Sequence, residues 1–116
     1  MTMVSEKNIQ NAIIIYLEYK KIFHYRQNTG ALATPTGGFI RYGTTGAPDI
    51  VCVIAGKYVG LEVKKPGGKL SAGQKLFSEK LKNAGGDYHV VCSIDDAIEV
   101  IKSYENLHKV IDHECS

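Results

Sequence analysis

The stretch GAPDIVCVIAGKYVGLEVKK, residues 46–65, decides the fold. It contains two apolar runs, 49–54 and 58–64, on either side of a short turn at 55–57. Runs of this length that are rich in Val and Ile and bounded by turn residues indicate β-strands. The stretch therefore predicts a β-hairpin, and the flanking sequence must supply the rest of the sheet and its cover.

The flanking sequence predicts helices before and after this hairpin. Ser5 can cap a helix that runs to about Ile22, because Ile9, Ile13 and Leu17 recur at helical spacing. The other expected elements are a strand at 23–28, a loop at 29–48 that could hold a strand at 39–42, a helix from Ser71 to Gly85, a strand at 88–92 and a final helix that begins at Ser93.

The order of these elements is helix, strand, strand, strand, helix, strand, helix (αβββαβα). A hairpin followed by a helical crossover implies a mixed sheet, antiparallel in its first part and parallel where the helix returns the chain. We therefore expect an α/β fold in which a mixed β-sheet is flanked by helices.

Length and composition indicate one ordinary globular domain. The chain has 116 residues, of which 44% are hydrophobic and 22% charged, and domains most often contain roughly 100 to 150 residues. No apolar run approaches the roughly 18 residues of a membrane-spanning helix, and the first residues lack the order of a secretory signal. We expect a single domain over residues 1–116, no membrane association and a cytoplasmic location.

The charge is distributed unevenly along the chain. Residues 57–82 contain seven lysines and two acids, whereas the residues after 82 contain two lysines and seven acids. A basic region beside an acidic flank is common among proteins that bind nucleic acids. A solvated, lysine-rich helix face explains the same count equally well.

Three charged residues, Asp49, Glu62 and Lys64, stand inside the apolar strands of the hairpin. Because side chains alternate along a strand, Glu62 and Lys64 share one face, roughly 6 to 7 Å apart, while the neighbouring valines and leucine face the core. If Ile54 pairs with Lys57, then Asp49 lies opposite Glu62, and a register shifted by two positions places it opposite Lys64. A shift of one position sends Asp49 to the other face.

Two carboxylates that face each other across a strand pair repel, and a cation must compensate them. Mg²⁺ and Mn²⁺ suit such a site, because they take oxygen ligands and keep several waters. Lys64, on the same face, could then orient a water molecule and balance charge on a phosphate. The competing interpretation is that Glu62 and Lys64 form an exposed ion pair on an edge strand and that Asp49 only begins its strand.

Pro48 and Asp49, followed by Glu62 and Lys64, form the pattern PD…ExK. This pattern resembles the signature of the PD-(D/E)XK nucleases. The surrounding segments GAPD, LEVKK, SAGQ and AGGDYHVV together resemble the VRR-NUC (virus-type replication-repair nuclease) family. The resemblance covers nearly the whole chain, from residue 6 to about residue 98.

The resemblance implies a restriction-endonuclease-like fold and Mg²⁺-dependent hydrolysis of DNA, in which Mn²⁺ can replace Mg²⁺. If the chain is viral, its location would be the cytoplasm of the host cell. Its catalytic residues would be Asp49, Glu62, Lys64 and Gln74. Its metal ligands would be Glu6, Asp49, Glu62 and the backbone carbonyl of Val63.

Two of these residues also have a structural explanation. Glu6 lies in the first turn of the predicted helix, where an acid favours the helix dipole. Gln74 stands three residues after Ser71, which is the spacing of a capping box. The two roles of Gln74 are compatible, because a cap fixes the backbone that aims the side chain.

Contacts to DNA must come from residues other than the acids, which repel the phosphate backbone. The candidates are Arg26, Asn28, Arg41, Lys65 and Lys69. For any one of them, solubilising surface charge is the competing interpretation. Nothing in the sequence indicates a base-reading motif such as a zinc finger or a helix-turn-helix, so we expect DNA to be recognised by shape.

The family that the chain resembles includes stand-alone homodimers that act on branched DNA such as four-way junctions. The resemblance thus implies branched DNA and a second copy of the chain as partners. In the first predicted helix, Ile14, Ile15 and Tyr19 lie outside the apolar stripe that faces the core, so they suit contact with a partner subunit. The alternatives are a nuclease of the same fold that acts on linear or foreign DNA and a non-catalytic DNA-binding module. The stretch GTTGAPD lacks the order of a phosphate-binding loop.

Overall fold

The hairpin at residues 46–65 forms the centre of the sheet. In the computed structural model, which describes residues 4–27 and 30–115, β4 (Ile50–Ile54) and β5 (Lys57–Val63) pair antiparallel, with Ile54 opposite Lys57. The turn residues Ala55 and Gly56 have φ angles of 54° and 76°, as a type I′ turn requires. Of the two registers that place Asp49 on the face of Glu62, the first is therefore correct.

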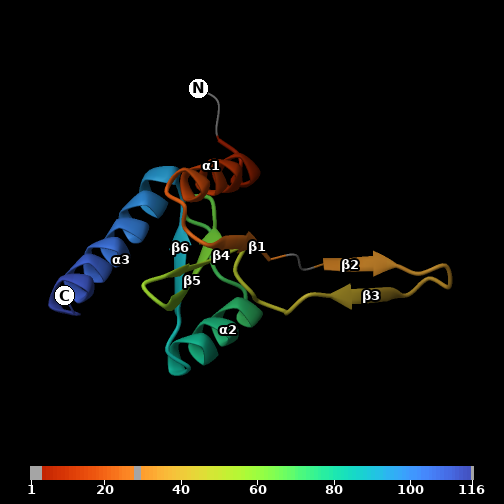
Figure 1. Ribbon diagram of the computed structural model, residues 1–116. Coiled ribbons are helices and arrows are strands. Elements are labelled where there is room, and N and C mark those ends of the chain that lie inside the picture. The colour runs from red at the N-terminus through yellow and green to blue at the C-terminus, as the bar shows by residue number, and fades with distance from the viewer. Residues whose placement is uncertain (1–3, 28–29, 116) are drawn as a thin grey trace.

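Two further strands complete a mixed sheet in the order β1-β4-β5-β6 (Figure 1). β1 (His24–Arg26) pairs antiparallel with β4, and β6 (Asp87–Val91) pairs parallel with β5. The crossover between β5 and β6 is the helix α2 (Ala72–Asn83). The expected α/β class and mixed sheet flanked by helices are confirmed.

Two helices, α1 (Glu6–Tyr19) and α3 (Ile94–Cys115), bury one face of this sheet. The core consists of alternate residues of the strands together with one stripe from each helix: Ile50, Cys52, Ile54, Val59, Leu61, Val63, Val91, Ile9, Ile13, Leu17, Ala97, Ile101 and Tyr104. α2 lies on the opposite face, where Phe77 packs against Tyr88 of β6 with ring centroids 6.0 Å apart.

The first helix begins as expected and ends earlier. The side chain of Ser5 accepts a hydrogen bond from the Asn8 N–H and caps α1. The helix stops at Tyr19 rather than near Ile22, because Lys21 adopts a left-handed backbone with φ 57°. This turn directs Ile22 back against the core.

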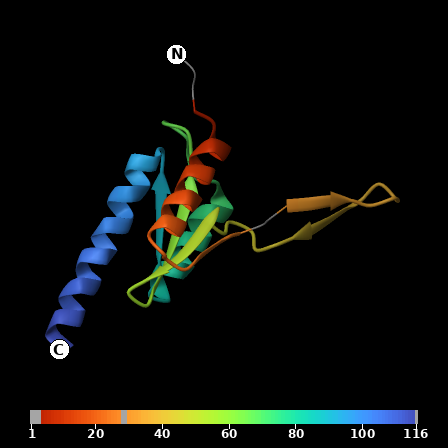
Figure 2. The same cartoon turned by 45° about the horizontal axis from the view of Figure 1, so that its top comes forward.

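The segment that the sequence assigned to a loop contains a second sheet. β2 (Gly30–Ala33) pairs antiparallel with β3 (Phe39–Tyr42), so the element order is αβββββαβα rather than αβββαβα. At the tip, Thr34 Oγ1 accepts a hydrogen bond of 3.0 Å from the Gly38 N–H. The expected strand at 39–42 is confirmed, whereas β2 was missed because Gly and Ala have low strand propensity. Figure 2 shows this outer hairpin extending away from the sheet.

Over the described residues, no helix combines the length and apolar character needed to cross a membrane.

A chain of polar side chains links α3 to β6. The Tyr104 hydroxyl donates to the carboxylate of Asp87, which also pairs with Lys57 at 3.3 Å. His89 Nε2 lies 2.7 Å from the same hydroxyl. Because the hydroxyl proton is directed at Asp87, neutral His89 must carry its own proton on Nε2 and donate it to Tyr104.

The environment of His89 makes stability depend on pH. Burial lowers the pKa of His89 below its ordinary value, Asp87 opposes this shift, and Lys57 adds to it. The unfolded chain therefore binds the proton more readily, and the folded state loses stability as the pH falls through about 6.5. We expect the urea midpoint of the wild type to fall more between pH 7.5 and 5.5 than that of His89→Gln, measured without metal. Equal pH dependence in both proteins would contradict this assignment.

Candidate functional site

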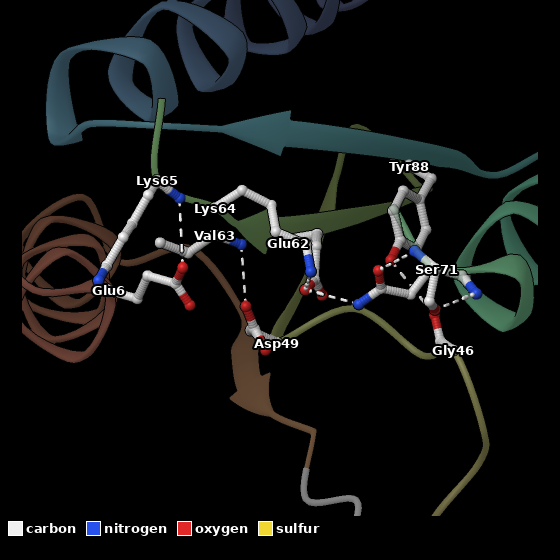
Figure 3. Close-up of polar contacts among 10 residues, drawn as sticks. Glu6, Gly46, Asp49, Glu62, Val63, Lys64, Lys65, Ser71 and Tyr88 are labelled. Carbon is white, nitrogen blue, oxygen red and sulfur yellow. Dashed lines mark hydrogen bonds and ion pairs between the residues drawn. The ribbon is translucent and has the colours of Figure 1, made fainter. Parts of the chain in front are cut away.

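The polar residues of the hairpin lie where β4 begins and β5 ends (Figure 3). Asp49 immediately precedes β4, and its Oδ2 accepts a hydrogen bond of 2.9 Å from the Val63 N–H. Glu6, from α1, accepts one of 3.2 Å from the Lys65 N–H. The N–H groups of Val63 and Lys65 point to the same edge of β5, because alternate N–H groups along a strand do so. Asp49 and Glu6 therefore lie along the part of this edge that is not paired with β4.

Glu62 lies beside these acids and is almost fully buried, with 4% of its surface exposed. Its Oε2 accepts a hydrogen bond of 2.9 Å from Gln74 Nε2 and lies 3.7 Å from Lys64 Nζ. Its Oε1 is buried without a hydrogen-bond partner among the described residues. The interpretation of Glu62 and Lys64 as an exposed pair on an edge strand is wrong, because β5 is an interior strand.

The ionised forms of both hairpin acids are disfavoured in the metal-free protein. Burial raises the pKa of Glu62 to about 7, and the negative charge of Asp49 adds to the rise, against the opposing effects of Lys64 and Gln74. Burial also raises the pKa of Asp49, although the Val63 N–H and the charge of Lys64 oppose it. The single positive charge of Lys64 therefore does not compensate the two buried acids.

The residues present fit a hard divalent cation. A buried carboxylate oxygen without a partner is costly, and Glu62 Oε1 is such an atom. The carbonyl of Val63 points to the same edge as its N–H, toward Asp49. Across residues 4–27 and 30–115, no three His, Cys, Asp or Glu side chains come close enough to bind a metal ion together. A cation here would complete its shell with carbonyl and water oxygens, as Mg²⁺ commonly does.

Gln74 both caps the helix α2 and contacts the candidate site. Ser71 Oγ accepts a hydrogen bond of 3.2 Å from the Gln74 N–H, and Gln74 Oε1 accepts one of 2.9 Å from the Ser71 N–H. This capping box starts α2. The remaining end of the side chain, Nε2, donates to Glu62, so the cap fixes the position from which Gln74 reaches the acid.

A contact between two glycines holds the loop before Asp49 against α2. A Cβ atom on Gly46 would lie 2.2 Å from the carbonyl oxygen of Gly73, so only glycine permits this approach. Tyr88 secures the same loop by donating a hydrogen bond of 3.2 Å to the Gly46 carbonyl. Burial raises the pKa of Tyr88, and the negative charges of Glu62 and Asp49 raise it further.

Sequence reasoning missed Gly46, Gly73 and Tyr88 as parts of this site. Gly46 and Gly73 stand 27 positions apart, and nothing in their local sequences signals that they touch. Tyr88 could have been found from alternation, since β6 places it opposite Gly60, on the face of Glu62.

The structure gathers only some of the predicted DNA contacts near the acids. Lys65 and Lys69 lie exposed on the loop that leaves β5, and the Lys65 N–H donates to Glu6. Arg26 lies on the opposite face of the sheet and donates a hydrogen bond to Asn11 of α1. Arg41 belongs to β3 of the outer hairpin, and Asn28 lies outside the described residues. Their contacts to DNA stay predictions.

The three residues of α1 that were expected at a subunit interface differ in exposure. Ile14 packs against the core. Ile15 and Tyr19 are 67% and 81% exposed. Two of the three residues expected at a subunit interface are therefore free to contact another molecule.

Comparison with known proteins identifies the fold. No protein-family model matches the sequence, and no curated protein does. Among solved structures, the chain is similar to a protein described as a VRR_NUC domain protein, with a TM-score of 0.61, 20% sequence identity and coverage of 90% of each chain. The protein therefore has the fold of a VRR_NUC domain protein, as the resemblance in its sequence implied.

Proposed function

We propose that the protein is a metal-dependent DNA endonuclease of the VRR-NUC type. The observation that supports this proposal most is Glu62, a buried carboxylate with an unpartnered oxygen beside Asp49 and Lys64. Such an arrangement lowers stability and is retained where function requires it. The shared fold with a VRR_NUC domain protein supports the same activity.

In this proposal the metal ligands are the carboxylates of Asp49 and Glu62, the carbonyl of Val63 and, from α1, the carboxylate of Glu6. Among the described residues the three carboxylates do not meet closely enough to share an ion, so Glu6 would have to move toward the other two. Mg²⁺ or Mn²⁺, when bound, supplies Lewis-acid stabilisation of the negative charge that develops on the phosphate. The acids of the site alone repel DNA, and a bound cation would favour their ionised forms.

The side chains around the acids supply orientation and positive charge. Lys64 Nζ, 3.7 Å from Glu62, carries donors that can bind both the attacking water and a phosphate oxygen. The water oxygen bonds to phosphorus and releases a proton to solvent, the ester bond opposite it breaks, and the leaving oxygen takes a proton from solvent. Gln74 holds Glu62 by one oxygen and leaves the other free.

We further propose that the substrate is branched DNA, such as a four-way junction, and that the enzyme acts as a homodimer. A two-fold axis would place two sites on two strands of a symmetric junction. The exposed side chains of Ile15 and Tyr19 on α1 support a subunit contact there. A monomeric mass by light scattering at micromolar concentration would count against the dimer.

The decisive test is cleavage of a labelled four-way junction and of its linear arms, with Mg²⁺ or EDTA. We expect the wild type to cut the junction only with metal and Lys64→Ala to cut it about 10²-fold more slowly, while both still bind it in EDTA. Lys102→Ala, on α3, is the matched control and should cut normally. Binding without any cleavage by the wild type would instead favour a non-catalytic DNA-binding module, and equal cleavage of the linear arms would favour a nuclease without junction preference.

A further inference from the structure

The helix α2 borders a groove that the proposed catalytic residues do not use. The groove has a volume of about 490 Å³ and runs between α2 and the loop before Gly46. Leu76, Phe77 and Lys80 line it on the helix side, and Thr44 and Thr45 on the loop side. No residue of α2 is buried, and Leu76 is 52% exposed, so the apolar stripe of this helix is open to a ligand.

The groove begins next to the proposed site. Gly73 forms part of its wall and directly precedes Gln74, which donates to Glu62. On the loop side, Thr45 adjoins Gly46, the residue that touches Gly73. The groove and the proposed site therefore border each other at the contact between Gly46 and Gly73.

The charge around the groove fits a polyanion. Lys80 lies in the groove itself, and α2 carries Lys75 and Lys82 against the single acid Glu79. Of the 116 residues, the segment 57–82 carries the largest lysine excess, with seven lysines and two acids. Lys80 would therefore contact a phosphate directly, and the other lysines of the helix add to the positive potential around the groove.

The apolar floor of the groove distinguishes between forms of DNA. A duplex presents phosphates and sugars to a protein surface, and its base faces are stacked. Leu76 and Phe77 offer apolar surface that suits the exposed faces of unpaired bases, as in other single-strand binding grooves. A volume of about 490 Å³ lies within the usual range for a small ligand and accommodates a nucleotide.

We propose that this groove binds an unpaired stretch of the DNA strand next to the phosphate that is cut. Lys80 contacts a phosphate of that stretch, and Leu76 and Phe77 contact a base. The assignment of the neighbouring phosphate rests on the proposed nuclease function. The groove supplies a physical reason for preferring DNA whose branch point has, or readily opens to, unpaired nucleotides, because continuous duplex offers none; a fully paired four-way junction must open a base pair to fill it.

The test measures binding of a labelled 15-nucleotide single strand and of a matched duplex by fluorescence anisotropy in EDTA. We expect Lys80→Ala to weaken single-strand binding about fivefold and to reduce the slope of log K against log salt by about 0.7, the value for one phosphate contact. Lys82→Ala is the matched control, because it removes the same charge from the same helical turn outside the groove. Equal losses in the two variants would overturn the proposal.

A second variant tests the apolar floor. Leu76→Ala should weaken single-strand binding about fivefold, because it removes buried apolar contact with a base, and should leave duplex binding within about twofold. Phe23→Ala removes a similarly exposed apolar side chain at the opposite edge of the sheet and should change neither. Circular dichroism confirms that both variants fold. Unchanged single-strand binding by Leu76→Ala, or an equal loss on duplex, would overturn the proposal.

The two proposals can fail independently. If the wild type with Mg²⁺ cuts no substrate while Lys80→Ala and Leu76→Ala still weaken single-strand binding selectively, the groove stands and the nuclease function fails. If the wild type cuts normally and neither variant alters binding, the nuclease function stands and the groove is not a DNA site.

Discussion

Glu62→Gln should abolish cleavage and, at the same time, stabilise the metal-free protein above pH 7. The substitution removes a buried charge and keeps the size of the side chain and an oxygen that can accept from Gln74. A lost metal ligand removes several kcal/mol of transition-state stabilisation, so we expect a loss of about 10³-fold or more in cleavage rate. A purely structural residue would show the opposite effect on stability.

The sign of the stability effect follows from the pKa of Glu62. Its pKa is about 7 in the folded protein, against 4.5 for an ordinary glutamate, so the folded state binds a proton that the unfolded chain has released. Stability of the wild type therefore falls as the pH rises from 4.5 to 7, and the full penalty applies above pH 7. Glu62→Gln lacks this penalty and should be more stable by about 1–2 kcal/mol at pH 8.

Urea unfolding in EDTA at pH 5 and pH 8 measures this difference. Glu99→Gln, an exposed acid on α3, is the matched control and should follow the wild type at both pH values. Adding Mg²⁺ should raise the melting temperature of the wild type and leave that of Glu62→Gln unchanged. A variant that is less stable than the wild type at pH 8, or that still cuts DNA, would show that Glu62 does not act as proposed.

Gly46→Ala should cause the largest loss of stability among single substitutions near the site. Its φ of 82° is unfavourable for alanine, and the added Cβ would lie 2.2 Å from the Gly73 carbonyl oxygen. Backbone strain and overpacking each cost about 1–2 kcal/mol, so we expect a loss of about 3 kcal/mol. Moving Gly73 also moves Gln74, and cleavage should fall with it.

Gly67→Ala separates the two causes. Gly67 has a nearly identical φ of 83°, yet a Cβ there would meet no atom within 4 Å. Its loss of stability should therefore be limited to the backbone cost of about 1–2 kcal/mol, with cleavage unchanged. Equal losses in the two variants, measured by urea unfolding, would mean that the contact between Gly46 and Gly73 contributes nothing.

The sequence predicts the centre of the fold well, because local patterns determine it. Alternation and turn chemistry define β4 and β5, and the spacing of Ser71 and Gln74 predicts the cap of α2. The strand β2, and with it the pairing of the outer hairpin, was not predicted, because Gly30–Ala33 has no alternation of apolar and polar residues and a low strand propensity.

The depth of the candidate site could not be predicted from local patterns. Alternation correctly placed Glu62 on the face opposite Leu61. No local pattern in the sequence indicates which segments cover that face, so the burial of Glu62 could not be predicted. In the structure, Pro48 packs over Gly60 and α2 closes the same side. Burial, and with it the raised pKa of Glu62, arises from segments that meet only in three dimensions.

The outer hairpin is an insertion in topological terms. β1 and β4 are neighbours in the sheet, and β2 and β3 lie between them in the sequence. At the base of this insertion the Gln27 N–H donates a hydrogen bond of 2.9 Å to the Asp49 carbonyl. The pairing of β1 with β4 is therefore complete before the chain enters the outer hairpin. Length and sequence can change in this module without displacing the acids, so evolution, or an engineer, can exchange the outer hairpin while the chemistry of the site is inherited intact.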